Sequence, residues 1–418
     1  MKTSIWIVVL VVAAILAGVV GYYAKICPPP SCPPAPTYPS PPQQGKNITA
    51  GFIYKNITAG FIYIGPIGDY GWTHAHDQGR KYVENEFPWL KTMYAESVAE
   101  ADAAKYIEDM LAKGADVIFT TSFGYMDPTL EEAKKHPDKI FFHCSGYKRA
   151  ANMGTYFAEF YQLYYLNGLM AGALTKTNKV GYVAGFTTPE VVRHINAFAI
   201  GVKEVNPNAK VYVRVLNAWY DPTRAREAAE ALIAEGVDVL AFTEDSPTVV
   251  QVAEEHYKKG QPIYAFGHYS PMKAYGPDVC VSGQIVHWEK IYEDILAKIY
   301  LGIYTNTNLQ NVDYWWMLRE GAVELGCSPG EPINPAIADK LKAVKVKEKI
   351  TGKEMSVYDL VMLRLAQMSE EVPTFDPFTG PLYDNKGNLM AAPGERLGHD
   401  ALWNMQWWMD NVIPPPAG

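Results

Sequence analysis

Two stretches of the chain, LAKGADVIFTTS and IAEGVDVLAFTEDS, are near-copies of one another and constrain the fold more than any other feature. Each contains the end of a helix closed by a glycine (Gly114 and Gly236), then an apolar strand, then a polar loop. A wholly apolar strand that follows a helix is typical of a parallel sheet covered by helices on both faces. Two such units about 120 residues apart predict two similar α/β lobes.

Strand and helix patterns alternate along the chain beyond residue 58, as expected for such lobes. The expected strands cover 58–64, 92–97, 116–121, 139–143, 179–184, 211–216, 238–242 and 262–266. Helices are expected over 101–113, 189–205 and 223–235, among others. With 418 residues, of which 48% are hydrophobic and 20% charged, the chain can bury two cores, and disorder is excluded for its bulk.

Several function classes are disfavoured by charge and by missing motifs. The 37 basic and 45 acidic residues give a formal net charge of −8, which argues against a nucleic-acid binder. Five cysteines without a CxxC pair argue against a disulfide-stapled scaffold and a zinc ribbon. No P-loop, complete dinucleotide loop or GxSxG elbow occurs, so neither an enzyme nor a cofactor is expected. His74 and His76 diverge on a helix, and no metal site is expected there.

The N-terminal segment predicts a membrane location for the whole protein. Residues 4–24 carry no charge and are long enough to cross a bilayer as a helix, so 1–25 is interpreted as a retained anchor. A cleaved signal peptide is the alternative. The proline-rich stretch 26–45 predicts a semi-rigid extracellular stalk. Its cysteines, Cys27 and Cys32, could pair, stay free or carry lipid.

The nine-residue sequence KNITAGFIY occurs twice in tandem, at 46–54 and 55–63. The second copy runs directly into GPIGDYGW, so it is expected to form the first core strand. The first copy is either an inert duplication or a spare edge strand that mediates self-association. Each copy contains an N-x-T sequon, which fits an exported segment.

Polar and aromatic side chains follow many of the predicted strands, and parallel sheets bind ligands at the carboxyl ends of their strands. Tyr125 and Tyr269 occupy such positions. The candidate ligand-binding residues are Asp69, Trp72, Thr73, Ser122, Phe123, Trp219, Asp221, Asp245, Ser246 and His268. Aromatic faces with carboxylates and hydroxyls suit a flat, neutral heterocycle that carries N–H donors. No Lys or Arg cluster accompanies them, so an anionic ligand is disfavoured.

Several blocks of the sequence resemble the basic membrane protein family of solute-binding proteins that serve ABC transporters. These blocks include GPIGDYGWTHAHDQGRKYVE, TTSFGYMD, YYLNGLMAGALTKTNKVGYVAGF, PEVVRHINAFAIGVKEVNPNAKV, NAWYDPTRAREAAEALI, TEDSPTVVQVAEE and FTGPLYDNKGNL. The resemblance covers about residues 56–412. It implies a two-lobed type I periplasmic-binding-protein fold of the α/β class with parallel sheets, preceded here by the membrane helix and the stalk.

The resemblance also implies lobe boundaries and a ligand. Lobe 1 is expected over 55–175 with part of 283–310, and lobe 2 over 176–282 with part of 311–412. The family binds purine nucleosides, and members with the Gly-Trp-Thr form of the first loop resemble binders of a free purine base. By that resemblance Asp69 hydrogen-bonds the base and Trp72 stacks on it. The nucleoside type has Phe-Asn where this chain has Trp72-Thr73. A lipobox is missing, and residues 306–335 form an insertion.

The expected function is therefore capture of a purine base or nucleoside outside the cell and its delivery to an ABC transporter permease. The expected partners are the purine, the permease and the membrane. A sensory or self-assembling surface protein that uses the same fold is the alternative.

Overall fold

The computed structural model describes residues 56–415. The expected membrane helix (1–25), the proline-rich stalk (26–45) and the first nine-residue copy (46–54) lie outside the described residues. Within 56–415, no helix combines the length and the apolarity that crossing a bilayer requires.

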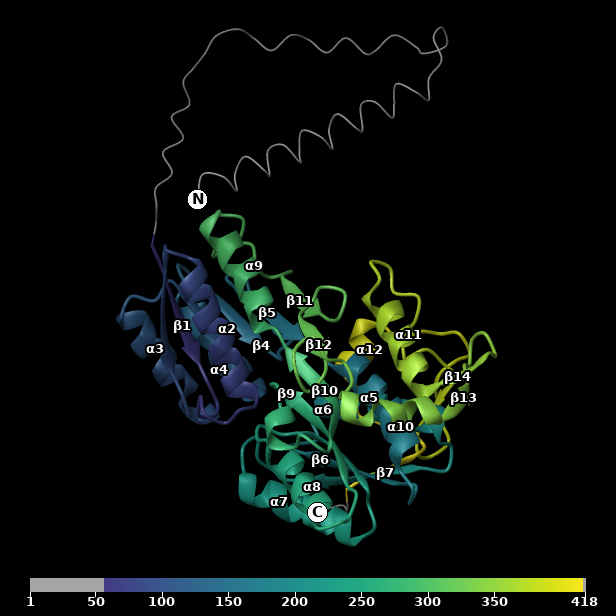
Figure 1. The fold of residues 1–418 in the computed structure, drawn as a ribbon. Coiled ribbons are helices and arrows are strands. Elements are labelled where there is room, and N and C mark those ends of the chain that lie inside the picture. The colour runs from purple at the N-terminus through teal and green to yellow at the C-terminus, as the bar shows by residue number, and fades with distance from the viewer. Residues whose placement is uncertain (1–55, 416–418) are drawn as a thin grey trace, which may run out of the picture. The chain divides into compact units, whose positions relative to one another are not determined.

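Lobe 1 is built on a six-stranded sheet in which every neighbouring pair is parallel (Figure 1). In spatial order its strands are β11 (Asp313–Trp316), β5 (Met153–Ala158), β4 (Ile140–Cys144), β3 (Val117–Thr120), β1 (Ile57–Ile62) and β2 (Leu90–Ala95). The second nine-residue copy supplies β1, which lies inside the sheet between β2 and β3. Four main helices accompany this sheet, namely α2 (Trp72–Glu86), α3 (Ala103–Ala112), α4 (Met126–Lys135) and α9 (Trp288–Tyr300).

Alternating side chains of β1 and β3 divide the lobe 1 core into two layers. Phe61 and Phe119 belong to the core cluster that includes residues of α2 and α9. Ile62 and Ile118 belong to the cluster that includes residues of α3 and α4. The α2–α9 pair and the α3–α4 pair, whose members contact each other, therefore cover opposite faces of the sheet.

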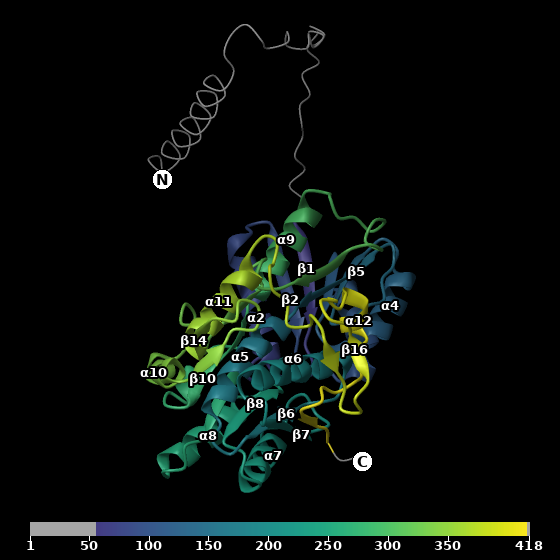
Figure 2. The same ribbon diagram turned by 90° about the vertical axis from the view of Figure 1, so that its right-hand side faces the viewer.

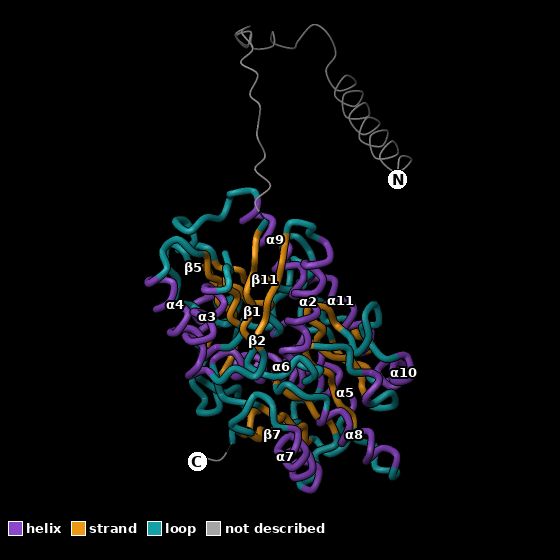
Figure 3. The backbone as a smooth tube through the Cα atoms, turned by 90° about the vertical axis from the view of Figure 1, so that its left-hand side faces the viewer, coloured by secondary structure: helices purple, strands orange, loops and turns teal. Residues whose placement is uncertain are grey.

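Lobe 2 is built on a seven-stranded sheet (Figure 3). Its spatial order is β12 (Val323–Leu325), β10 (Cys280–Val286), β9 (Tyr264–Tyr269), β8 (Val239–Thr243), β6 (Lys179–Ala184), β7 (Lys210–Val215) and β17 (Val412–Ile413). Only the edge strand β12 runs antiparallel to its neighbour. The main helices of this lobe are α5 (Tyr161–Leu174), α6 (Pro189–Val205), α7 (Pro222–Ala234) and α8 (Thr248–Lys258).

The chain crosses between the two sheets three times: from β5 through α5 to β6, from β10 to α9, and from β11 to β12. The C-terminal part adds further elements beside α5 and α6 (Figure 2). These are α10 (Pro335–Ala343), β13 (Lys345–Lys347), β14 (Glu354–Ser356), α11 (Val357–Ser369), β15 (Leu382–Tyr383), β16 (Leu389–Ala391) and α12 (His399–Trp403). Every residue of α5 is buried, because α6, α10, α11 and β10 all contact it.

A disulfide that the sequence analysis did not anticipate joins Cys280 at the start of β10 to Cys327 just after β12. It fastens the short antiparallel edge strand to the rest of the lobe 2 sheet. Cys144 is a free thiol in β4, and His143 precedes it there; both side chains are fully buried.

Candidate ligand-binding site

A cavity lies where the carboxyl ends of strands from both sheets meet. Lobe 1 supplies Ile64, Trp72, Thr121, Ser122, Phe123 and Ser145, and lobe 2 supplies Glu190, Trp219, Asp245 and Tyr269. The cavity volume is about 20 Å³, which holds about one water molecule. Ligand pockets commonly measure about 300–1,000 Å³, so this one is small and narrow.

The ten residues predicted from the sequence divide into two groups of five. Those that line the cavity are Trp72, Ser122, Phe123, Trp219 and Asp245. Those that lie beside it without lining it are Asp69, Thr73, Asp221, Ser246 and His268.

Asp69 holds the loop that carries Trp72. Its carboxylate accepts hydrogen bonds from the backbone N–H groups of Gly71 (2.8 Å), Thr73 (3.0 Å) and His74 (2.9 Å). Burial raises the pKa of Asp69 to about 6, although these N–H groups favour its charged form. The hydroxyl of Thr73 accepts a hydrogen bond from the N–H of Gly65 at 3.1 Å and fastens the same loop. The side chains of Asp69 and Thr73 therefore hold the loop that positions Trp72. A direct hydrogen bond between Asp69 and a ligand remains a prediction.

The other three non-lining residues also have local partners. Asp221 caps α7, because its carboxylate accepts the N–H of Arg224 at 3.0 Å. The Ser246 hydroxyl donates to Glu244 at 3.0 Å. His268 is fully buried, with Nδ1 2.8 Å from the side-chain oxygen of Gln284. Burial lowers the pKa of His268 well below its ordinary value, which keeps the ring neutral.

Aromatic rings from both lobes form the walls of the cavity. Trp72 is the first residue of α2, and its indole N–H donates to the carbonyl of Thr121 at 2.5 Å, which fixes the ring. The Tyr269 ring of lobe 2 meets it edge-on at 5.1 Å. Trp219 packs against Phe186 at 4.8 Å. Rings fixed in this way offer flat faces to a planar ligand.

Two carboxyl groups face the cavity. Asp245 is 2% exposed and lines the cavity. Burial raises the pKa of Asp245 well above its ordinary range, and nearby Asp69 and Glu244 raise it further. Burial also raises the pKa of Glu190 to about 7, against the opposing effects of Arg193 and of a hydrogen bond from Ser145. These groups can accept N–H donors when charged and donate a proton when neutral.

Strained backbone gathers around the same place. Five residues with positive φ, between 55° and 64°, follow or end strands at their carboxyl ends: Tyr70, Ser97, Ser145, Asn217 and Tyr269. Such conformations persist only where the surrounding structure enforces them, and they cluster at ligand sites. The strain therefore supports the cavity as the functional centre of the protein.

Five lining residues were not among the ten candidates: Tyr269, which the sequence analysis noted only for its position after a strand, and Ile64, Thr121, Ser145 and Glu190, which it missed. Ser145 follows β4 directly, so the rule that selected the other candidates also reaches it. Glu190 lies in the first turn of α6, six residues after β6, where no pattern distinguishes it from an ordinary helix-start carboxylate.

The raised pKa of Glu190 predicts a pH-dependent stability. The folded protein holds this proton up to about pH 7, whereas an unfolded chain releases it near its ordinary pKa of 4.5. The folded state therefore binds more protons between these values, and the free energy of unfolding falls as pH rises through them. Glu190→Gln is expected to stabilise the ligand-free protein at pH 8 by on the order of 2 kcal/mol.

Urea unfolding of the wild type and the variant at pH 5 and pH 8 measures this effect. The exposed Glu86 of α2 provides the control, and Glu86→Gln should leave the pH dependence unchanged. If Glu190→Gln and wild type are equally stable at pH 8, the surroundings of Glu190 do not disfavour its charged form and the prediction is wrong.

Comparison with known proteins places the chain among binding proteins of transporters. The model of the family described as ABC transporter substrate-binding protein PnrA-like matches residues 56–360. A purine-binding protein of Brucella abortus is 36% identical over 369 residues, which are 88% of this chain and 93% of that protein. A Haloferax volcanii protein, named provisionally as an ABC transporter glucose-binding protein, is 38% identical over 76% of this chain and 75% of its own length.

The fold is shared with a solved structure from Aeropyrum pernix, described as an ABC transporter solute-binding protein. The TM-score is 0.62 at 16% identity, over 77% of this chain and 94% of that one. At this identity the likeness concerns the two-lobed α/β fold alone.

Proposed function

Because the chain belongs to the PnrA-like family of ABC-transporter substrate-binding proteins, we propose that it captures a purine base between its lobes and delivers it to a transporter permease. The family is a solute-binding class rather than a class of enzymes. Purine binding is also what the name of the Brucella abortus relative states for that protein.

The observation that carries the proposal is a narrow aromatic cavity with one buried and one half-buried carboxyl group, Asp245 and Glu190. Trp72, Phe123, Trp219 and Tyr269 supply ring faces, on which a planar heterocycle stacks. Asp245 supplies a buried acceptor that lines the cavity, and N–H groups of a base can bind it with charge-assisted hydrogen bonds. No lysine or arginine lines the cavity, so a phosphorylated ligand is disfavoured.

The lining also argues for a base over larger or more polar solutes. A nucleoside adds a ribose, whose hydroxyls need further hydrogen-bond partners in the lining. A hexose carries hydroxyls around its whole ring, and such a ring needs many side-chain donors as well as acceptors. The cavity lining offers three hydroxyl residues and one tyrosine, and no amide, lysine or arginine side chain.

Capture would proceed by closure of the two lobes around the ligand. The crossings between the sheets serve as hinges, and the ligand favours the closed arrangement because it contacts residues of both lobes. A surface location with the binding domain outside the cell agrees with the family and with the apolar N-terminal segment. Anchoring by that segment and self-association through 46–54 remain predictions on residues outside those described. A sensory or self-assembling role for the same fold is the alternative function.

Calorimetric titration with adenine, guanine, adenosine and glucose tests the proposal. Wild type should bind a purine base, and Asp245→Asn should weaken that binding about 10- to 100-fold, since charged hydrogen bonds contribute about 1.5–3 kcal/mol. The same substitution should stabilise the ligand-free protein, because it removes a carboxyl group whose ionisation burial disfavours. Asp221→Asn is the matched control, since Asp221 caps α7 outside the cavity and asparagine also caps helices.

Two results would contradict the proposal: binding of glucose without binding of any purine, or equal affinity of Asp245→Asn and wild type. Mass spectrometry of the small molecule released on denaturation gives an independent identification of the ligand.

A further inference from the structure

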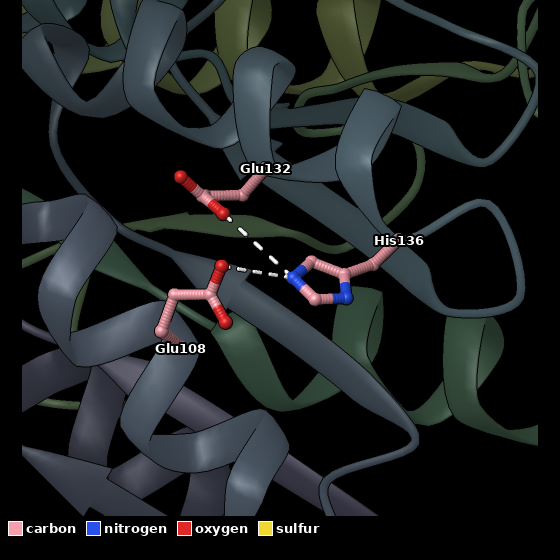
Figure 4. A group of neighbouring side chains, drawn as sticks. All are labelled: Glu108, Glu132 and His136. Carbon is pink, nitrogen blue, oxygen red and sulfur yellow. Dashed lines mark hydrogen bonds and ion pairs between the residues drawn. The ribbon is translucent and has the colours of Figure 1, made fainter.

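Three potential metal ligands converge between α3 and α4 on lobe 1 (Figure 4). Glu108 comes from α3, whereas Glu132 lies in α4 and His136 caps its C-terminus. The spacing of four residues places Glu132 and His136 on one side of the helix. The ring Nε2 of His136 lies 3.0 Å from Glu108 Oε1 and 3.8 Å from Glu132 Oε2. Among residues 56–415, no other group of three histidine, cysteine or acidic side chains brings its ligand atoms close enough together to share one metal ion.

Glu132 provides a second and independent observation that favours a cation at this place. It is 1% exposed, and its Oε1 forms an ion pair with Lys135 at 2.7 Å. Its Oε2 is buried and has no hydrogen-bond partner among the described residues. A buried carboxylate oxygen without a partner is energetically costly, and this one points toward the imidazole and the carboxylate of Glu108.

A protonated His136 alone does not satisfy this group. The imidazole ring has one N–H at Nε2, which can donate to Glu108 Oε1 at 3.0 Å. Glu132 Oε2 lies 3.8 Å from the same nitrogen, which is beyond hydrogen-bonding distance. A metal ion bound by Nε2 accepts all three ligands at once. Tetrahedral coordination at zinc distances separates neighbouring ligand atoms by about 3.3 Å, and the two measured separations lie on either side of that value.

We propose that Glu108, Glu132 and His136 bind a divalent transition-metal ion of the zinc type on the surface of lobe 1. One imidazole with two carboxylates suits zinc, whereas magnesium prefers oxygen ligands alone. The side chains of Glu108 and His136 are 48% and 29% exposed, so water reaches the fourth coordination position. The ion connects α3 to α4, the helix pair that covers one face of the lobe 1 sheet, and it acts as a brace away from the ligand cavity.

A second histidine offers a matched control. His287 also has two carboxylate partners, Glu289 on Nδ1 at 2.8 Å and Glu324 on Nε2 at 2.9 Å. Its carboxylates lie at opposite ring nitrogens, so no single point reaches all three groups. His287→Gln therefore removes a histidine with the same kind of surroundings and leaves the proposed site intact.

The test uses the full-length protein stripped of metal with a chelator and titrated calorimetrically with zinc chloride or magnesium chloride. Zinc should bind wild type at one site that both His136→Gln and Glu132→Gln weaken at least about tenfold. His287→Gln should keep wild-type affinity, and magnesium should not bind at this site. Zinc should also raise the thermal unfolding temperature of wild type and of His287→Gln but not that of His136→Gln.

Thermal unfolding without metal shows first that each variant is folded. Because His136 is only half-buried whereas Glu132 is buried, His136→Gln is the decisive variant if Glu132→Gln fails to fold. The proposal is overturned if wild type binds no zinc, or if His136→Gln binds zinc as wild type does. Loss of binding in His287→Gln alone would assign the metal to that histidine and would equally overturn it.

Discussion

Replacing Glu159 by glutamine is expected to destabilise the protein by about 3–5 kcal/mol, the usual effect of removing one partner of a buried ion pair. Glu159 follows β5 and precedes α5 at the first crossing between the sheets, and its N–H donates to the carbonyl of Trp316 at 2.7 Å. Its carboxylate pairs with Arg193 of α6 at 2.6 Å, and both side chains are fully buried.

The carboxyl group of Glu190 also interacts with Arg193 electrostatically, but Glu159 is the carboxylate that forms the ion pair. Arg193 also donates to the carbonyl of Leu402 at 2.7 Å, and its guanidinium lies over the rings of Trp315 and Trp403. Glutamine keeps the shape of glutamate but removes the charge, which leaves a buried guanidinium without its counter-ion. The expected loss therefore exceeds that of an ordinary hydrogen bond.

Urea unfolding at pH 7 measures the loss. Glu255→Gln provides the matched control, because Glu255 pairs with Arg226 at 2.7 Å on the surface, where such pairs contribute about 0–1 kcal/mol. Burial would raise the pKa of Glu159, but Arg193 and His194 outweigh it and lower the pKa to about 2. The contribution of the pair is therefore present above pH 4.5 and is lost as pH falls toward 2. A destabilisation no larger than that of the control would contradict the expectation.

Gly71→Ala is expected to weaken ligand binding by more than about tenfold, because the substitution separates the lobes where they touch. A Cβ atom on Gly71 would lie 2.6 Å from the carbonyl carbon and 2.7 Å from the Cα of Asp245. These are backbone atoms, which cannot rotate away. Gly71 belongs to the loop after β1 in lobe 1 and Asp245 to the loop after β8 in lobe 2, so relief requires the loops to move apart.

Gly68→Ala is the control, since it adds a methyl group to the same loop with nothing within 4 Å of the new atom. Calorimetry with the ligand of the wild type measures the affinity, and small-angle X-ray scattering of the ligand-saturated proteins measures lobe separation. The prediction is wrong if the two alanine variants bind equally well and scatter alike.

Local patterns predicted the parts of the fold that local chemistry determines. The helix over 189–205 and the strand over 179–184 were predicted with the bounds that α6 and β6 have. For α6 the reasons are visible in the sequence, since Thr188 caps the helix and Pro189 begins it. The α/β class and the two lobes followed from the same repeating units.

The strand β10 was missed because its sequence, CVSGQIV, carries polar residues through a buried strand. Ser282 donates to the carbonyl of Pro332 at 2.6 Å, and Gln284 lies 2.8 Å from His268 Nδ1. These partners lie far away in the sequence, so no local pattern reveals that the polar groups are satisfied.

For the site, the sequence predicted positions better than side-chain directions. The rule that ligands bind after parallel strands led to the residues around the cavity, but it did not distinguish those that line the cavity from those that hold a loop. Asp69 and Asp221 both turn toward backbone N–H groups near the start of a helix, as short acidic side chains commonly do. Asp245 does not, and only the packing around it leaves its carboxylate toward the cavity.

The bond between Cys280 and Cys327 links the binding function to the redox state of the surroundings. It closes a segment of 47 residues that contains α9 and β11, and this segment makes two of the three passages between the lobes. The three-residue strand β12, which ends the third crossing between the sheets, pairs with β10 alone. Without the disulfide, only these few backbone hydrogen bonds would attach β12 to the lobe 2 sheet. Cytoplasmic thiol systems keep cysteines reduced, whereas secretory environments oxidise them. A chain made and kept inside the cell would therefore have a looser hinge than the exported protein, and binding measurements should use material that has been oxidised.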